Sequence, residues 1–332
     1  MQIIFISLAS CSVLILLIRG VAHRFGIVDH PGGRKQHAMP TPMVGGLAMY
    51  LAVLLVMMWF DKLAGNVAVL MGCAAVLVML GLLDDKHGLS VPLRMMIQVF
   101  LVSIVIVGAE GTITHLGALF GSTVLLGMFA VPFSVIAFVG GINAINMIDG
   151  ADGMAGKMAL ITMLGVASIF CLSGHCELLP LSMAIIGALA GFLLFNTRIF
   201  VRRAWVFMGD AGSMWLGLAL GWFMAQITKG EVSAEPALVL WLFGIPLIDT
   251  LTVMIRRLKR KQSPFAADRT HIHHVLEHTG LSVRRTVLVL SGVQMIMVGI
   301  GVIFYMMHAP AALVFWSFVV LFAAYYYRLR GC

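Results

Sequence analysis

The strongest constraint on this chain is its succession of apolar stretches, each long enough or nearly long enough to cross a lipid bilayer. A spanning helix needs about 17–25 mostly apolar residues. Hydrophobic residues make up 61% of the chain and charged residues only 11%, which excludes a soluble enzyme because too little polar surface remains to cover the core. We therefore expect an all-α integral membrane protein, a polytopic bundle of about 11 transmembrane helices. The expected spans lie near residues 2–18, 44–60, 64–83, 93–109, 123–142, 157–173, 178–196, 211–228, 237–255, 286–307 and 311–327.

The distribution of basic residues predicts how this bundle is oriented. Alternate connections hold 20 of the 22 Lys and Arg residues, and only Lys62 and Lys229 fall on the other side. Basic connections stay in the cytoplasm, so we expect the N-terminus outside and the C-terminus in the cytoplasm. No basic residue precedes the first apolar stretch, so we expect a retained span and not a cleaved signal peptide. The net charge of +8 would attract anionic lipid head groups or an anionic substrate to the cytoplasmic face.

Five aspartates share the basic side of the bundle, each at or near the end of an expected helix. The acidic residues of the opposite side lie in short turns and share no pattern. Carboxylates within a basic surround suggest a site for a divalent cation and a phosphate-bearing ligand. The five residues are Asp84, Asp85, Asp149, Asp152 and Asp210.

Asp84 and Asp85 end the third expected span as an adjacent pair. Two such carboxylates repel each other and oppose the helix dipole, so they need a compensating cation. An interfacial stop signal paired with Lys86 is the alternative interpretation.

The run N-A-I-N-M-I-D-G-A-D-G at residues 143–153 is the most specific feature of the chain. Polar residues at every third position rotate around a helix, so they cannot hold one face and the helix must end near Gly150. We expect the two asparagines to point inward from the last turn and the two aspartates to converge from the loop. Glycines at 150, 153 and 156 would permit positive φ and close ligand approach. The four polar residues are Asn143, Asn146, Asp149 and Asp152.

Two further motifs lie on the same side. In F-M-G-D-A-G-S at 207–213, Asp210 is placed as a hard-cation ligand near a helix N-terminus, although a helix cap alone would fit. The 256–285 connection contains H-I-H-H at 271–274, for which phosphate or sugar hydrogen bonding is favoured over zinc because no cysteine is near. Asp249, inside the ninth span, has two open interpretations: it is a functional acid, or it pairs with Arg256, seven residues later on the same helix face.

Together these motifs resemble the polyprenyl-phosphate N-acetylhexosamine-1-phosphate transferase superfamily, and most of all its bacterial undecaprenyl-phosphate N-acetylglucosamine-1-phosphate transferases. The resemblance extends from Val28 to about Arg285, while the last two spans match only in hydropathy. Residues 263–274 match the S-P-F-x-x-D-R-x-H-I-H-H pattern of those enzymes. The chain departs from some members at 40–42 and in lacking a basic C-terminal tail, neither of which touches the core motifs.

The resemblance implies a reaction in which the lipid phosphate attacks the β-phosphorus of a UDP-sugar and releases UMP. It implies Mg²⁺, for which Mn²⁺ could substitute, as the cofactor. By their places in the motifs, Asn146 and Asp210 would hold the metal; Asp149, Asp152 and Phe207 would bind the nucleotide; Arg94, Arg257, His271, His273 and His274 would contact phosphate and sugar; and Asp84 and Asp85 would be catalytic, beside the reacting phosphates.

The role of Asp84 has more than one interpretation within the family: a base for the lipid phosphate, or a nucleophile in a two-step path. A phosphate monoester has a second pKa of about 6, so the attacking oxygen is already largely ionised at neutral pH. We therefore favour direct attack, with the aspartate pair orienting the phosphate and supporting the cation.

The resemblance also predicts the setting of the protein. We expect one membrane-embedded transferase domain over 1–332 in a bacterial inner membrane, acting in the first membrane step of O-antigen or other cell-surface polysaccharide synthesis. Its partners would be UDP-N-acetylhexosamine, undecaprenyl phosphate and the bilayer, with no nucleic acid, and a homodimer is left open. The active-site loops would face the cytoplasm, at 19–43, 84–93, 143–157, 197–213 and 256–285.

Three alternatives remain at this stage. The same chemistry could use another UDP-N-acetylhexosamine, or it could move phospho-N-acetylmuramoyl-pentapeptide, although the enzymes of that second kind typically carry consecutive histidines. An ion-coupled transporter could use intramembrane aspartates, but the sequence shows no internal repeat and its acids gather at one face.

Overall fold

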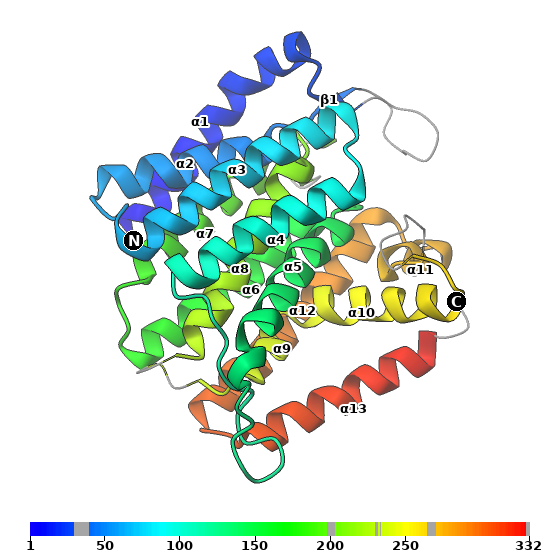
Figure 1. Ribbon diagram of the computed structural model, residues 1–332. Helices are drawn as coiled ribbons and strands as arrows, with labels where there is room; N and C mark the ends of the chain where they lie inside the picture. The colour runs from blue at the N-terminus through cyan, green and yellow to red at the C-terminus, as the bar shows by residue number, and fades with distance from the viewer. Residues whose placement is uncertain (30–39, 198–202, 230–231, 233, 264–269, 330–332) are drawn as a thin grey trace.

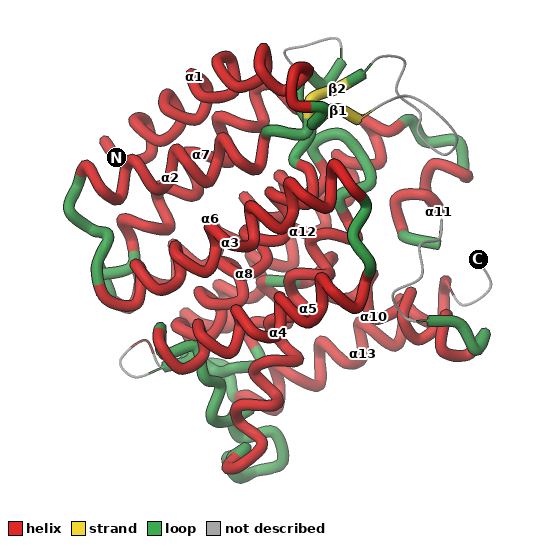
Figure 2. The backbone as a smooth tube through the Cα atoms, turned by 45° about the horizontal axis from the view of Figure 1, so that its top comes forward, coloured by secondary structure: helices red, strands yellow, loops and turns green. Residues whose placement is uncertain are grey.

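The computed structural model describes residues 1–29, 40–197, 203–229, 232, 234–263 and 270–329, and these parts are almost entirely helical (Figures 1 and 2). Within them, eight helices are long and apolar enough to cross a membrane. The expectation of a polytopic helical membrane protein is therefore confirmed. The helices are α1 (Gln2–Phe25), α2 (Gly45–Trp59), α3 (Gly65–His87), α4 (Val91–Gly108), α5 (Ala130–Ile148), α6 (Met154–Ser173), α7 (Leu179–Asn196), α8 (Gly209–Ile227), α9 (Leu238–Leu242), α10 (Gly244–Lys259), α11 (Ile272–His278), α12 (Val283–Met306) and α13 (Ala311–Leu329).

The only sheet in the described residues is a short ribbon. Strand β1 (Val28–Asp29) pairs antiparallel with β2 (Thr41–Pro42), and a single 3₁₀ turn, η1 (Gly127–Phe129), leads into α5. The ribbon continues into the site, because Phe207 N–H donates to the Pro42 carbonyl at 2.8 Å.

The ninth expected span, 237–255, is divided in the structure into α9 and α10, with Phe243 outside helical geometry. Pro246 explains the break, since it has no N–H to donate to the Leu242 carbonyl. Buried Gln294 of α12 repairs the ladder: its side chain donates to the Leu242 carbonyl at 2.8 Å and accepts from Ile245 N–H at 2.8 Å. A broken helix inside a membrane is tolerated when neighbours satisfy the freed backbone groups in this way.

Helix α8 occupies the centre of the bundle, where it packs against α2, α3, α5 and α6. Its large side chains Trp215, Trp222 and Phe223 are fully buried. Each indole N–H finds a carbonyl, Trp215 at Gly46 (3.2 Å) and Trp222 at Ala109 (2.7 Å), as buried tryptophans require. The first turn of α8, which carries Asp210, therefore rests on a rigid core.

Small residues set how closely α3 approaches the start of α8. A Cβ added at Gly81 would lie 2.2 Å from the backbone nitrogen of Ala211, so no larger residue fits there without moving a helix. This contact brings the last turn of α3, which includes Asp84 and Asp85, against the first turn of α8.

The elements that carry the polar motifs meet at one end of the bundle. Figure 1 shows the end of α3, the start of α4, the β1–β2 ribbon and α11 together at the right, while α1 begins at the opposite end. In the same view α13, in red, diverges from the other helices, and its main helix contacts are with α9 and α10.

Candidate active site

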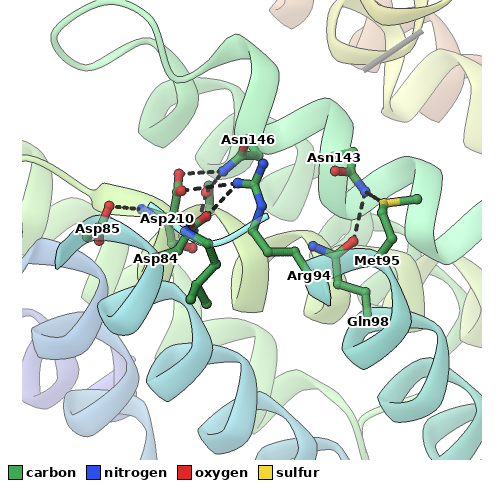
Figure 3. Close-up of polar contacts among 10 residues, drawn as sticks. Asp84, Asp85, Arg94, Met95, Gln98, Asn143, Asn146 and Asp210 are labelled. Carbon is green, nitrogen blue, oxygen red and sulfur yellow. Dashed lines mark hydrogen bonds and ion pairs between the residues drawn. The ribbon is translucent and has the colours of Figure 1, made fainter. Parts of the chain in front are cut away.

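Arg94 lies between two of the predicted carboxylates (Figure 3). Its guanidinium forms an ion pair with Asp84 at 2.5 Å and lies 3.5 Å from Asp210. The other Asp84 oxygen accepts from Leu89 N–H at 2.7 Å, across the turn that begins at Gly88. Arg94, from the first turn of α4, is thus the cation beside Asp84 and Asp210.

Asp85 faces the opposite way from Asp84 and caps the N-terminus of α8. One carboxylate oxygen accepts from the backbone N–H of Asp210 at 3.0 Å. Gly209 permits this contact, because its φ is +69° and a Cβ there would lie 2.5 Å from the other oxygen, Oδ2. That Oδ2 atom is buried and finds no hydrogen-bond partner among the described residues.

Asn146 completes the cluster from the last turn of α5. Its amide nitrogen lies 2.7 Å from Asp210 Oδ1 and 2.9 Å from Ser213 Oγ. The prediction for Asn143 was wrong: one turn earlier, its amide donates to Gln98 Oε1 at 2.9 Å and to the Val139 carbonyl, away from the cluster (Figure 3). The reason is the rotation of a three-residue spacing, which turns Asn143 toward α4.

The helix ends where the sequence predicts it should, with Asp149 as the C-cap of α5 and α6 starting at Met154. Of the three glycines in this segment only Gly153 has positive φ (+78°), whereas the other two serve close packing. Burial, with smaller contributions from the nearby carboxylates of Asp210 and Asp152, raises the pKa of Asp149 to about 7. This loop therefore concentrates negative charge beside the carboxylate cluster.

Phe207 is held by the backbone at the edge of the same site. Its N–H donates to Pro42, and its carbonyl accepts from Gly45 N–H at 2.9 Å. Its side chain is half-buried. These two bonds fix the backbone of Phe207 next to the β1–β2 ribbon and the start of α2.

The histidine motif forms the short helix α11, which begins one residue after His271. His273 is buried against the loop that follows α5, since a Cβ at Gly150 would lie 2.5 Å from its Nε2. Burial lowers the pKa of His273 to about 4, with a smaller contribution from the neighbouring His274 and His271. Neither His273 ring nitrogen has a hydrogen-bond partner in the described part of the chain.

The basic segment before this motif is described only in part. Arg257 is buried at the end of α10, and His274 lies 3.7 Å from Glu277. Arg269, within the motif at 263–274, lies outside the described residues, as do parts of the expected loops 19–43 and 197–213. The structure thus brings the histidines to the 149–153 loop but leaves the approach of Arg269 undescribed.

The donor set of the cluster fits a hard cation. No group of three His, Cys, Asp or Glu in the described residues is arranged to enclose a metal ion. Mg²⁺ does not need such a cage, because it keeps several waters and takes one or two carboxylates plus substrate phosphates. Asp210 with Asn146 supplies that pair of oxygen donors once the amide turns its oxygen inward, and the unpartnered Asp85 Oδ2 marks local anionic excess.

Comparison with known proteins agrees with this geometry. Residues 67–228, which contain the carboxylate cluster, match the family described as glycosyl transferase family 4. The chain is 32% identical over 97% of its length to undecaprenyl-phosphate alpha-N-acetylglucosaminyl 1-phosphate transferase of Escherichia coli K12, covering 87% of that protein. It belongs to this family. The chain is therefore a transferase, and its helices are those of a multi-pass membrane protein.

Other bacteria also carry similar proteins. The enzyme of the same name from Salmonella typhimurium is 33% identical over 88% of this chain and 80% of its own length. A probable undecaprenyl-phosphate N-acetylglucosaminyl 1-phosphate transferase of Bacillus subtilis is 33% identical over 86% of this chain and 79% of its own. Because these matches span nearly the whole chain, the family resemblance inferred from the motifs is confirmed.

Sequence reasoning missed two polar partners of the site. The Ser213 hydroxyl oxygen accepts a hydrogen bond from the Asn146 amide. Ser213 lies three residues after Asp210, a spacing that places Ser213 and Asp210 on one helix face. Asp249 has a partner that the sequence did not indicate: its carboxylate lies 2.7 Å from His271 Nδ1. No spacing rule could have paired residues so far apart in sequence.

Proposed function

We propose that the protein transfers N-acetylglucosamine 1-phosphate from UDP-GlcNAc to undecaprenyl phosphate, giving undecaprenyl-pyrophosphoryl-GlcNAc and UMP. The observation that carries the proposal is the carboxylate cluster at one end of a membrane bundle: Asp84 and Asp210 contact Arg94, and Asp85 accepts from the Asp210 backbone N–H. The names of the full-length relatives support the same lipid and sugar. Phosphoryl transfer needs charge neutralisation and in-line positioning more than covalent chemistry, and this cluster offers both.

In this proposal Asn146 and Asp210 hold Mg²⁺, which when bound neutralises charge on the pyrophosphate. Arg94 already contacts Asp84 and Asp210. Its guanidinium can therefore donate to a substrate phosphate oxygen in place of a carboxylate oxygen. Asp85 keeps the α8 N-terminus, and with it Asp210, in place. The oxygen-donor pair and the unpartnered Asp85 Oδ2 support this assignment.

Asp84 is proposed to orient the lipid phosphate, with Asp85 beside it, and not to act as a base. Both of its oxygens already accept hydrogen bonds, from Leu89 N–H and from Arg94. The attacking phosphate is largely ionised near neutral pH, because its second pKa is about 6. An Asp84→Asn variant that is active at high pH but inactive at low pH would restore the base role.

The nucleotide is proposed to bind between Phe207 and the loop that carries Asp149 and Asp152. Base stacking on an aromatic ring suits the fixed, half-buried Phe207. The raised pKa of Asp149 supports a hydrogen bond from this group to the nucleoside, since part of its population is protonated near neutral pH.

The sugar is proposed to contact the segment that contains Arg257, His271, His273 and His274. The two unpartnered ring nitrogens of His273 support this, because buried polar atoms without partners are rare unless a ligand satisfies them. A site that hydrogen-bonds specific hydroxyl or amide groups rejects analogues lacking them far better than an apolar pocket does. Sugar choice is therefore assigned to this segment.

The finer topology is also a proposal. We infer eleven membrane crossings, with α9 and α10 together making the ninth, the N-terminus outside and the C-terminus in the cytoplasm. The alternation of helix ends in Figure 1 and the basic connections support it. The site would then face the cytoplasm of a bacterial inner membrane, where UDP-sugars are available.

The decisive experiment measures UMP release by purified protein from UDP-GlcNAc. Release should require both undecaprenyl phosphate and Mg²⁺, and a parallel panel should show weaker use of UDP-GalNAc and of UDP-MurNAc-pentapeptide. UMP release without lipid phosphate, or none from any UDP-sugar, would overturn the transferase proposal. Preference for another sugar would keep the chemistry and change the substrate.

A further inference from the structure

Asp249 is a buried acidic group outside the carboxylate cluster, and it has three polar contacts. It lies on α10 just after the Pro246 break and is 1% exposed. Its Oδ2 lies 2.7 Å from His271 Nδ1, and its Oδ1 accepts from Ile272 N–H at 2.9 Å and from Tyr325 OH at 3.4 Å. Three separate elements, α10, α11 and α13, therefore meet at this one carboxylate.

We propose that Asp249 is a positioning residue for His271. An ionised carboxylate can only accept hydrogen bonds, so the proton in the 2.7 Å contact belongs to His271 Nδ1. This fixes the ring in one tautomer and leaves Nε2 to act toward the substrate. The partner of one ring nitrogen sets the state of the other wherever histidine acts chemically.

The surroundings of His271 direct it toward the site. It is 5% exposed, and its ring stacks at 6.0 Å on that of His273, which itself packs on Gly150 beside Asp149. The Ile272 N–H bond fixes the backbone of the same residue pair, so ring and backbone are held by one group. The Gln294 contacts with Ile245 and Leu242 hold the start of α10, the helix that carries Asp249.

The inference rests on the proposed function only in that His271 touches the substrate. A purely structural role would make Asp249 a clamp between helices, and an isosteric amide could keep both bonds. In Asp249→Asn, the amide oxygen can still accept from Ile272 N–H, while the amide NH₂ donates to His271 Nδ1. The substitution therefore preserves the packing and reverses the tautomer of His271.

The test compares Asp249→Asn, His271→Ala and a control, Thr252→Val, in UMP release and thermal unfolding. Thr252 lies on the same helix, is fully buried, and its hydroxyl has no hydrogen-bond partner among the described residues. We expect Asp249→Asn to lower kcat/KM about 10–100-fold, the usual loss when a supporting partner is removed. Its thermal unfolding should stay near that of Thr252→Val, which should keep normal activity.

The tautomer is read directly in the wild-type protein, so the inference stays testable if Asp249→Asn fails to fold. A long-range ¹⁵N–¹H spectrum of histidine-labelled protein should show His271 protonated at Nδ1, identified by the peak lost in His271→Ala. Protonation at Nε2 in the wild type, or full activity of Asp249→Asn beside an inactive His271→Ala, would overturn the inference. Full activity of His271→Ala would instead refute the proposed substrate contact.

Discussion

At the scale of single residues, Asp210 carries the most demanding prediction. It is approached by two polar groups, Arg94 and the Asn146 amide, so we expect its carboxylate to serve the site more than the fold. Asp210→Asn should lower UMP release about 10²–10³-fold, the loss expected when a preorganised charged group is removed. Thermal unfolding should be nearly unchanged. A near-normal rate with normal Mg²⁺ dependence would remove Asp210 from the proposed metal pair.

Phe207 offers a second residue-scale test, on the nucleotide. If its ring stacks on uracil, Phe207→Ala should weaken the binding of UDP-GlcNAc and of UMP together, by about 1–3 kcal/mol. The backbone bonds to Pro42 and Gly45 do not depend on the side chain, so the local fold should persist. Competition by UMP measures the effect, and a loss confined to the lipid substrate would move Phe207 elsewhere.

At the scale of helices, the contact between α3 and α8 holds the carboxylates together. A methyl group at Gly81 would collide with the Ala211 backbone, whereas a Cβ at Gly72 on the same helix meets nothing within 4 Å. Gly81→Ala should therefore destabilise the protein by about 1–3 kcal/mol and reduce activity through the Asp85–Asp210 contact. Gly72→Ala should be neutral or slightly stabilising. Equal thermal unfolding of the two variants would show that this packing does not determine the site.

The packing of α11 on the Gly150 loop should depend on pH. The pKa of His273 is lowered to about 4 in the folded protein, against about 6.5 for an ordinary histidine. Between these values the unfolded chain binds the additional proton, so stability is complete above about pH 6.5 and falls as pH drops toward 4, by up to about 3 kcal/mol.

The control for this pH dependence is His273→Gln, which cannot titrate. Asp149 acts in the opposite direction over an overlapping range, because its pKa is raised to about 7 and its stability contribution falls as pH rises. The difference in thermal unfolding between wild type and His273→Gln isolates the histidine. That difference should change steadily between pH 6.5 and 4, and a constant difference would contradict the burial of a neutral ring.

The elements also show what the sequence can and cannot predict. The end of α5 near Gly150 follows from the three-residue spacing of the polar residues, whereas the approach of Asn146 to Asp210 was expected from the family resemblance. The break before Gly244 was missed because the apolar run was interpreted as one span despite its proline. The carbonyl that the proline leaves free is satisfied by Gln294, which lies on a helix distant in sequence. The contacts of Asn143 with Gln98 and of Asp249 with His271 could not be predicted for the same reason: local periodicity gives the helix face of a residue, but tertiary packing decides its partner.

At the scale of the whole molecule, two faces of the bundle have different chemistry. The end that carries the aspartates also carries nearly all the basic connections, while the connections of the opposite end hold only Lys62 and Lys229 of the 22 Lys and Arg residues. Such an asymmetry both orients the protein in the membrane and raises the local concentration of an anionic nucleotide. In the proposed orientation, one charge distribution would both set the topology and attract the nucleotide. If the orientation were reversed, the basic end would no longer face the nucleotide.

The orientation can be tested with a cysteine that the chain already has. Cys176 lies exposed in the connection between α6 and α7, at the end of the bundle away from the aspartates. In a variant that keeps only this cysteine, a membrane-impermeant maleimide should label intact cells, because the connection is expected outside. The matched control places the one cysteine at Ser90, between α3 and α4, where labelling should require permeabilised cells. Labelling of Ser90→Cys but not of Cys176 in intact cells would invert the proposed topology and place the carboxylate cluster away from its nucleotide substrate.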